Sequence, residues 1–414
     1  MKSILLATAA SLAFVAPTEA ADPSGEIKRA SHETIIVTAK PRSREQYHLP
    51  TKTESVTAEK ITDTVNAVNT EDALKYLPNV LVRKRHIGDT QAPITTRTSG
   101  VGASARSLIY ADGVLLSALI GNNNGNASPR WSMVAPEEIT HIDVMYGPFA
   151  AAYAGNSIGS VVEITTRMPE HFEANAQVQG ALQSFSQYGT RDDYGTYQLS
   201  AGVGDKFGKL SARLAFNHLD SHSQPLAYVT ATRPASPSGA GTPVTGAFAT
   251  LNRTGAPIVV LGAGGLEHQM QDNITAKLAL DITPGLRLAY MLGVFVQDND
   301  ADVETYLRDA SGNPVFPSSV NIGGYNYSVP ASAFANNIYS LKQAHVMQSL
   351  ALRWLQYRGT NLPSTVSSSR GQRGSHALCT STRLCQRPGC PLILRDLRRE
   401  YLFLSSSSSS GFLE

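Results

Sequence analysis

Apolar residues recur at every second position in several stretches between residues 173 and 355, and this alternation limits the fold more than any other feature. In residues 210–216, Leu, Ala, Leu and Phe are separated by Ser, Arg and Ala, and residues 274–280 and 288–296 follow a similar pattern. A period of two places successive side chains on opposite faces of a β-strand. Six strands are predicted, over residues 174–185, 194–203, 209–217, 269–282, 286–297 and 342–355.

The predicted strands are joined by connections of two lengths. Short turns at residues 204–208 and 283–285 alternate with long segments rich in Gly, Pro, Ala and Ser, at about residues 223–267 and 299–341. Short turns at one end and long loops at the other are typical of transmembrane β-barrels, whose strands face lipid on one side and a polar lumen on the other. A soluble β-sandwich shows the same alternation, so it is kept as the alternative here.

Composition and the first residues fit an exported, β-rich protein. Charged residues make up 16% of the chain and the formal net charge is +2, so there is no basic footprint for nucleic acid. Residues 1–20 combine a basic start, an apolar core and small residues before Ala20, which indicates a secretory signal peptide. The alternative is a membrane anchor, but the apolar run is shorter than the roughly 20 residues that a spanning helix needs. A membrane-embedded mature chain would therefore be a β-barrel.

Residues 134–169 predict a compact α+β unit. A strand over residues 139–145 ends at Gly147 and Pro148, and a segment of small residues leads to a second strand over residues 161–166. β-Branched residues favour the two strands, and the glycines allow the tight turns between them.

The residues of this unit closely resemble the end of the plug domain of TonB-dependent outer-membrane receptors. The matching positions are Glu138, Ile139, Ile142, Asp143, Val144, Gly147, Pro148, Ala151, Ala152, Tyr153, Ile158 and Gly159. Earlier segments resemble the same plug, namely residues 70–80, a strand that ends in Arg97, and a strand over residues 107–110 that is followed by Asp112 and Gly113.

Two positions depart from the family pattern. Thr98 stands where a glycine usually follows the arginine, so the turn is expected to move toward Gly100. Tyr146 stands where an arginine is common, which argues against a salt bridge from the plug to the barrel at that position.

Residues 52–82 predict two helices followed by a strand. Thr70 is a suitable N-cap, Glu71 and Asp72 place acidic residues in the first turn, and Pro78 stops the helix.

The resemblance also implies a TonB box in the N-terminal segment 21–44. Its residues are Glu33, Thr34, Ile35, Ile36, Val37 and Thr38. TonB would capture this segment by adding it as a strand to its own sheet, so side chains can vary but an internal proline should not be tolerated. The implied domains that follow are a plug over residues 45–170 and a partial barrel over residues 171–356.

The implied fold is an α+β plug domain followed by an incomplete antiparallel transmembrane β-barrel. Six predicted strands fall short of the about 22 with which the family surrounds its plug. The tail over residues 357–414 lacks sustained alternation and holds all three cysteines, Cys379, Cys385 and Cys390. An odd, clustered set is unusual in an exported protein. We hypothesise that this aberrant, disordered tail results from a frameshift, and a genuine low-complexity tail is the alternative.

Two groups of metal-ligand type are set aside. His218 and His222 would share a strand face but lie roughly 13 Å apart at about 3.3 Å per residue, too far to bind one ion without other ligands. An acidic group opens the second long loop, at Asp298, Asp300, Asp302 and Glu304. Calcium could bind there, but a solvated acidic loop is favoured because the glycine and distal glutamate of an EF-hand are missing.

A polar loop at residues 122–126 is expected either to help touch a substrate or to be a simple connector. No catalytic arrangement and no cofactor or metal site is predicted, so the chain is not expected to be an enzyme.

The resemblance implies active uptake of a scarce solute, such as a ferric siderophore, across the bacterial outer membrane. The implied partners are TonB with its inner-membrane energising complex, outer-membrane lipid and the small-molecule substrate, but not nucleic acid. The alternatives are a non-functional truncation product and an outer-membrane ligand-binding or adhesion protein without transport.

Overall fold

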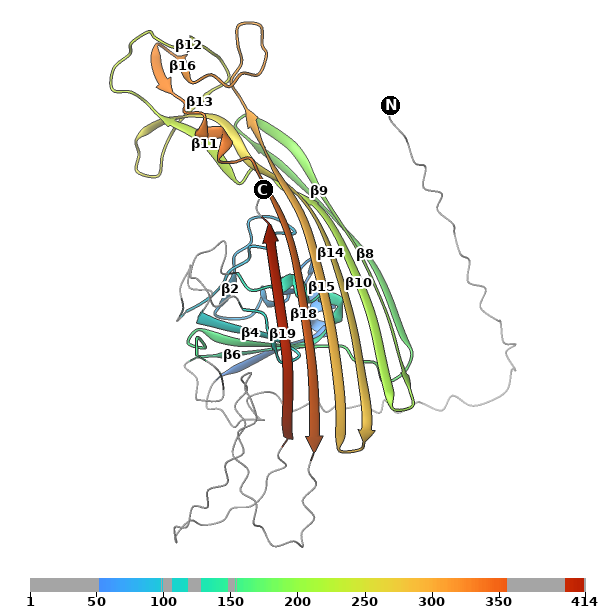
Figure 1. Ribbon diagram of the computed structural model, residues 1–414. Helices are drawn as coiled ribbons and strands as arrows, with labels where there is room; N and C mark the ends of the chain where they lie inside the picture. The colour runs from blue at the N-terminus through green and yellow to red at the C-terminus, as the bar shows by residue number, and fades with distance from the viewer. Residues whose placement is uncertain are drawn as a thin grey trace, which may run out of the picture. The chain divides into compact units, whose positions relative to one another are not determined.

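The computed structural model describes residues 52–97, 99, 106–117, 128–147, 153, 155–355 and 399–412, all within Pro41–Glu414. The expected signal peptide, the expected TonB box, the loop at 122–126, Pro148 and the three cysteines lie outside the described residues. The described chain forms a small mixed sheet followed by a larger antiparallel sheet (Figure 1).

Five strands form the smaller sheet, in the order β1-β6-β7-β4-β5. Their bounds are β1 Thr53–Thr57, β4 Ser107–Ala111, β5 Val114–Leu115, β6 Ile139–Tyr146 and β7 Ser160–Thr166. β4 and β7 run parallel, and the other neighbours run antiparallel. The two strands predicted in the α+β unit are confirmed as β6 and β7, and Ile142 lies opposite Ile164 across them.

The turn between β4 and β5 is the predicted Asp-Gly turn. Asp112 and Gly113 both have positive φ, at 46° and 87°. Two such residues in succession make the tight hairpin turn whose twist matches that of the paired strands.

β-Branched side chains from this sheet fill the core of the first domain. In the main buried cluster, those with at most 2% of their surface exposed are Ile109, Ile139, Ile142, Val144, Val162 and Ile164. Leu74, Ile94 and Trp131 pack into the same cluster. Each fully buried side chain of this size contributes about 1.5–3 kcal/mol relative to exposure in water.

The helical predictions near residue 70 were partly wrong. β1 comes first, followed by the short α2 Ala58–Thr64, and residues Thr70–Leu74 form a 3-10 helix, η1. Asn69, not Thr70, is the N-cap, and its N–H donates to the Asp72 carboxylate at 2.9 Å. The Thr70 hydroxyl instead donates to the Val134 carbonyl, so a long-range contact replaces the expected local cap.

β2 Val80–Val82 is the predicted strand, and it pairs with β3 Ile94–Thr96. Two further 3-10 turns are η3 Trp131–Met133 and η4 Pro136–Glu138.

The second sheet has nine strands, and we call its seven long, successive strands the wall. Their order is β19-β18-β15-β14-β10-β9-β8. Their bounds are β8 Glu173–Gln187, β9 Thr190–Phe207, β10 Leu210–His222, β14 Pro257–Thr283, β15 Leu286–Thr305, β18 Tyr339–Leu355 and β19 Arg399–Phe412. All six predicted strands are present and longer than expected. Within the described residues β8 and β19 are the two edges, so the wall is an open, incomplete barrel.

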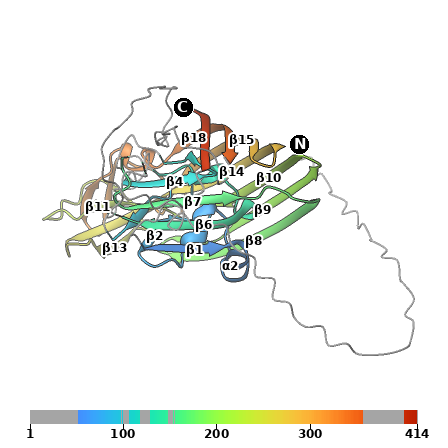
Figure 2. The ribbon, with the colours of Figure 1, turned by 90° about the horizontal axis from the view of Figure 1, so that it is seen from below.

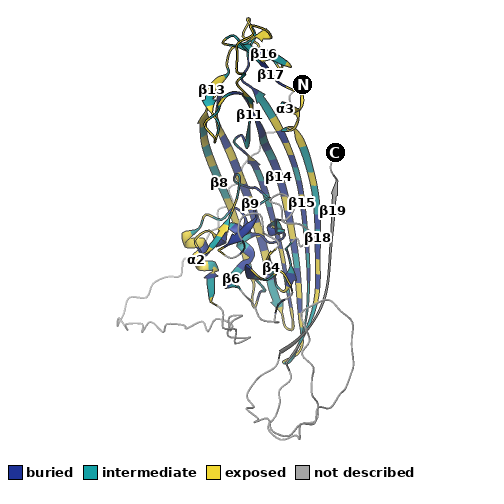
Figure 3. Cartoon of the chain, turned by 90° about the vertical axis from the view of Figure 1, so that its left-hand side faces the viewer, coloured by how far each residue is buried: buried dark blue, intermediate teal, exposed yellow. Residues whose placement is uncertain are grey.

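The two faces of the wall differ in polarity, as the alternation predicts. Large apolar side chains are exposed on one face, including Leu214 at 53%, Ile274 at 47% and Leu278 at 45%. Their neighbours in sequence, among them Arg213, Thr275 and Lys277, are polar and buried on the other face. Figure 3 shows this alternation of buried and exposed positions along the strands. An exposed apolar band on tilted strands is the surface that a lipid bilayer covers.

Among the described residues, no helix has the length and apolar character needed to cross a membrane.

The long connections are more ordered than the sequence predicts. β14 already begins at Pro257, and β11 Ala227–Thr232 and β13 Phe248–Leu251 pair with its first residues. The rest of the connections contains β12 Thr242–Pro243, β16 Ser319–Ile322, β17 Tyr325–Ser328 and α3 Ser332–Ala335. Val229, Leu261, Leu307, Val320 and Phe334 form a second buried core here.

The acidic group was wrongly placed at the start of a loop. Asp298, Asp300, Asp302 and Glu304 all lie within β15, which pairs with β14 as far as Thr305. Both faces of this part of β15 carry polar residues, so no apolar alternation reveals the strand. The polar residues Gln297 and Asn299 are buried on the inner face, each with 2% of its surface exposed.

Part of the tail also joins the wall. The backbone of β19 pairs with β18, and Ser405 to Ser410 lie opposite residues 344–349. A serine run has no alternation, which is why the sequence gives no sign of a strand there.

Candidate functional site

The first domain lies against the polar face of the wall, and this contact is the candidate site (Figures 1 and 2). Wall amide and hydroxyl side chains donate to backbone carbonyls of the first domain. The pairs are Gln198 with Val68 at 2.8 Å, Ser221 with Ile87 at 2.7 Å, Gln271 with Gly88 at 2.6 Å and Asn273 with Ser132 at 2.5 Å. Apolar contact is also present, because the wall residues Met291, Phe295 and Met347 join the buried cluster of the first domain.

The first ionic contact joins Arg213 of β10 to Glu138. The guanidinium binds the carboxylate with two nitrogens, Nη2 to Oε1 at 2.6 Å and Nε to Oε2 at 3.0 Å. Arg213 also donates to Glu173 at 2.7 Å and Asn175 at 3.0 Å. The Arg213 and Glu138 side chains are only 1% and 2% exposed. A bidentate, fully buried pair fixes the relative position of its two partners, and removing one of them leaves the other charge buried and unpaired.

The second ionic contact joins Lys277 of β14 to the Asp112 turn. Lys277 Nζ lies 2.8 Å from Asp112 Oδ2 and donates to the Arg167 carbonyl at 3.1 Å and to the Thr166 hydroxyl. The other carboxylate oxygen of Asp112 accepts the Thr166 N–H at 3.0 Å. Burial alone would raise the pKa of Asp112, but the Lys277 ammonium and these hydrogen bonds hold that pKa below its ordinary value.

The third contact surrounds the carboxylate of Glu267 on β14. From the first domain, Arg85 Nη1 lies 3.1 Å and His86 Nε2 lies 3.2 Å from its oxygens. From the wall, Gln269 donates at 2.6 Å, and the Tyr339 hydroxyl and the Asn299 amide also donate. The Glu267 side chain is fully buried, so several donors together satisfy a charge that water does not reach.

A carboxylate inside the first domain is also perturbed. Glu71 is 1% exposed and lies 3.4 Å from Lys84 Nζ, which is shared with Asp72 at 3.0 Å. Burial raises the pKa of Glu71 to about 7, although the Lys84 charge opposes the shift. This carboxyl therefore changes protonation near neutral pH.

Three of the residues predicted for the plug motif gather where β6 and β7 meet. The Gly147 N–H donates to the Gly159 carbonyl at 3.2 Å, and the Tyr153 hydroxyl donates to Glu163 at 3.1 Å. A Cβ atom on Gly159 would lie 2.7 Å from Ser107 Oγ, so this backbone approach requires glycine. Arg97 is apart from them and donates to Asn79 at 2.6 Å on the surface.

The wall contacts of the plug were missed by the sequence analysis. Tyr146 makes no such contact, and its hydroxyl donates to the Pro78 carbonyl at 2.5 Å. The charged contacts with the wall are made by Arg213, Lys277 and Glu267. The available signal was that Arg213 and Lys277 occur at inward positions of predicted strands, where a lumen alone would not require them. Glu267 gave no such signal, because it lay in a segment that was predicted to be a loop.

The comparisons with known proteins agree with this architecture. A sequence model of the TonB-dependent Receptor Plug Domain matches residues 45–161. No curated protein matches the chain.

Similar solved structures are outer-membrane or siderophore receptors. A ferric enterobactin receptor mutant (PfeA) from Pseudomonas aeruginosa has 15% identity and a TM-score of 0.43, with 74% of this chain and 47% of that chain covered. The siderophore receptor PirA from Acinetobacter baumannii has 15% identity and a TM-score of 0.42, with coverage of 78% and 44%. The ferripyoverdine receptor of the outer membrane of Pseudomonas aeruginosa has 15% identity and a TM-score of 0.41, with coverage of 74% and 32%.

This chain thus spans less than half the length of each of these receptors. The motif residues around β6 and β7 lie within the matched region. Residues 45–161 of this chain are therefore a plug domain of the kind found in TonB-dependent receptors.

Proposed function

We propose that this protein takes part in active uptake of a scarce solute across the outer membrane, with a ferric siderophore as the first substrate to test. The receptor would hydrolyse nothing itself, and TonB with its inner-membrane energising complex would supply the work. Outer-membrane lipid would cover the apolar face of the wall.

One observation carries the proposal, namely the polar character of the contact between plug and wall. Gln271 and Asn273 hold backbone carbonyls, and Arg213 holds a carboxylate. Water can replace each of these partners when the plug moves, whereas separating two apolar surfaces would expose both to water. A plug held in this way is well attached at rest and can still be displaced by a pulling force.

The pulling point would be the proposed TonB box, Glu33 to Thr38. We propose that the segment is captured as an added strand, so that main-chain hydrogen bonds carry the force and side chains matter little. The domain limits at residues 21–44, 45–170 and 171–356 are part of this proposal.

The test uses the full chain produced in cells that contain TonB. Deletion of residues 33–38 should abolish uptake of a ferric siderophore and leave its binding to the cell surface unchanged. Ile36→Pro should have the same effect because it removes a main-chain donor, while the matched Ile36→Ala variant should retain uptake. Uptake that survives both the deletion and Ile36→Pro would contradict the proposal and favour a ligand-binding protein without transport.

The frameshift origin of the tail is a separate proposal. Translation of the corresponding gene in the other two frames beyond Leu355 should yield further alternating segments. If neither frame does so, the tail is a genuine part of the protein and the frameshift proposal is wrong.

A further inference from the structure

Three side chains of metal-ligand type meet on the outer face of the wall. Across β10 and β14, the outward pairs run in register from Phe216 opposite Ile274 to Asp220 opposite Met270, and then to His222 opposite His268. Polar pairs therefore interrupt the apolar outer face toward this end of the two strands. The site lies at the end of β10 that leads into the first long connection.

Both histidine side chains approach the same carboxylate oxygen of Asp220. His268 Nε2 lies 3.1 Å and His222 Nδ1 lies 3.7 Å from Asp220 Oδ1. The imidazole rings are stacked, with centroids 4.0 Å apart and planes inclined by 11°. Because an imidazole nitrogen binds a metal in the plane of its ring, one ring must turn about its side-chain torsions for both nitrogens to bind the same ion. One ligand atom from each residue can be chosen so that all three lie within 4.8 Å of one another, and among the described residues no other group of three His, Cys, Asp or Glu does so.

These separations suit a tetrahedral ion. Two ligands at about 2.0–2.1 Å from such an ion lie about 3.4 Å apart, which falls between the two observed distances to Asp220. Two imidazole nitrogens and one carboxylate oxygen form a ligand set that zinc accepts, with a fourth position left for water.

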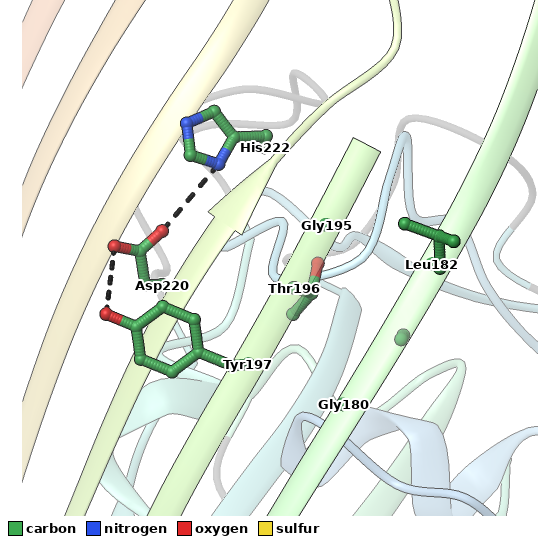
Figure 4. Close-up of a pocket in the computed structure, with 8 residues that line it drawn as sticks. Gly180, Leu182, Gly195, Thr196, Tyr197, Asp220 and His222 are labelled. Atoms are coloured by element: carbon green, nitrogen blue, oxygen red, sulfur yellow. Dashed lines mark hydrogen bonds and ion pairs between the residues drawn. The ribbon is translucent and has the colours of Figure 1, made fainter. Parts of the chain in front are cut away.

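A second observation supports a bound ion rather than simple His-Asp pairing. The Tyr197 hydroxyl donates to Asp220 Oδ2 at 3.2 Å, so it orients the carboxylate while Oδ1 faces the histidines (Figure 4). Orientation of a ligand by a hydrogen bond to its second atom is typical of metal sites.

The surface beside Asp220 is also hollowed. Gly180 and Gly195 lack side chains on the outer face, and together with Leu182, Tyr197 and His222 they line a shallow depression of about 550 Å³ (Figure 4). Water or a small ligand can therefore reach the fourth coordination position from this side. The half-exposed His222 ring, at 53%, is open to the same space.

We propose that Asp220, His222 and His268 bind one divalent transition-metal ion, with zinc as the preferred ion and water as the fourth ligand. The sequence analysis set His222 aside because His218 was its only partner in view. The structure supplies the missing partner, since His268 comes from β14, 46 positions further along the chain. The inference does not depend on the transport function.

The test uses the full chain, folded in detergent and stripped of metal with a chelator. Cys379, Cys385 and Cys390 are replaced by serine throughout and no histidine tag is present, because these groups would bind metal themselves. Titration with Zn²⁺, followed by calorimetry, should show one ion bound per chain. His222→Ala and His268→Ala should each weaken binding by at least about tenfold.

His218→Ala is the matched control, because His218 lies on the same face of the same strand but pairs with Asp272 at 2.8 Å. It should bind Zn²⁺ as the parent does. Equal affinity in the His222→Ala/His268→Ala double variant, or no binding by the parent, would overturn the inference.

A second measurement needs no substitution of a ligand. Cu²⁺ bound to the parent protein should show, by electron paramagnetic resonance, hyperfine splitting from two imidazole nitrogens. A spectrum with one nitrogen or none would contradict the site even if a histidine variant failed to fold.

Discussion

The core of the plug is apolar, whereas its contact with the wall combines many polar and charged side chains with the apolar residues Met291, Phe295 and Met347. In the core, Ile142, Val144 and Val162 are fully buried among other apolar side chains. At the wall, the plug is held by Arg213, Lys277 and buried amides. Apolar burial resists water and keeps the small sheet folded, whereas polar contacts can be exchanged for contacts with water. The proposed function therefore predicts that the plug moves as a folded body.

The largest expected effect comes from leaving a buried charge unpaired at the wall. Arg213→Ala should weaken plug attachment by about 3–5 kcal/mol, because Glu138 stays buried without its cation. Urea titration with Trp131 fluorescence as the plug reporter, in a Trp354→Phe background, measures the loss. The double variant Arg213→Met/Glu138→Leu should lose less than Arg213→Ala alone. A larger loss in the double variant would mean that the attraction between Arg213 and Glu138 contributes more than the cost of leaving Glu138 buried and unpaired.

A cavity in the plug core should lower stability slightly less than the loss of Arg213 does. It should also act on the folding of the plug and not on its attachment to the wall. Ile142→Ala is expected to destabilise the plug by about 2–5 kcal/mol, because Ile142 is fully buried and its neighbours cannot collapse completely. The same fluorescence titration measures it. Unlike Arg213→Ala, this variant should leave the plug attached to the wall until it unfolds. Detachment before unfolding would remove the distinction between the two regions.

Filling the close backbone approach at Gly159 should lower the stability of the plug by an intermediate amount. Gly159→Ala places a methyl group 2.7 Å from Ser107 Oγ and 2.9 Å from Ser99 Cβ, which should cost about 1–3 kcal/mol. Gly155→Ala is the matched control, since no atom lies within 4 Å of its added Cβ. Equal stability of the two variants in urea would show that Gly159 is not required for packing.

The smallest effect depends on pH and on Glu71. Its pKa is about 7 in the folded plug against an ordinary value of 4.5, so the folded state holds the proton more tightly. This contribution is complete below about pH 4.5 and is lost as the pH rises through 7, with a change of about 1 kcal/mol between pH 6 and pH 7. Glu71→Gln should flatten this part of the stability profile in urea titrations at a series of pH values. An unchanged slope would contradict the assignment.

Local patterns were enough to predict much of the fold. β-Branched runs gave β6 and β7, the family resemblance gave β4 with its Asp112-Gly113 turn, and alternation gave the centres of six wall strands. β1 was missed because its segment was predicted to be helical. The last part of β15 was missed because polar residues such as Asp298 and Asn299 occupy both faces there. β19 was missed because its serine run has no alternation.

The site itself was less accessible to sequence reasoning. The plug motif was recognised, but its attachment depends on which strand brings Arg213 to Glu138, 75 positions away. Likewise, His222 gains His268 only through the pairing of β10 with β14. Such contacts follow from tertiary arrangement, which spacing along the chain does not encode.

Thiol labelling in energised cells tests the central claim most directly. In a cysteine-free background, Gln271→Cys places a thiol on the wall under the plug, and Val144→Cys places one inside the plug core. During uptake driven by TonB, a water-soluble thiol reagent should label position 271 and leave position 144 unlabelled, and neither should react when the proton gradient is collapsed. Labelling of position 144 together with 271, or of neither during uptake, would contradict a plug that moves as a folded body.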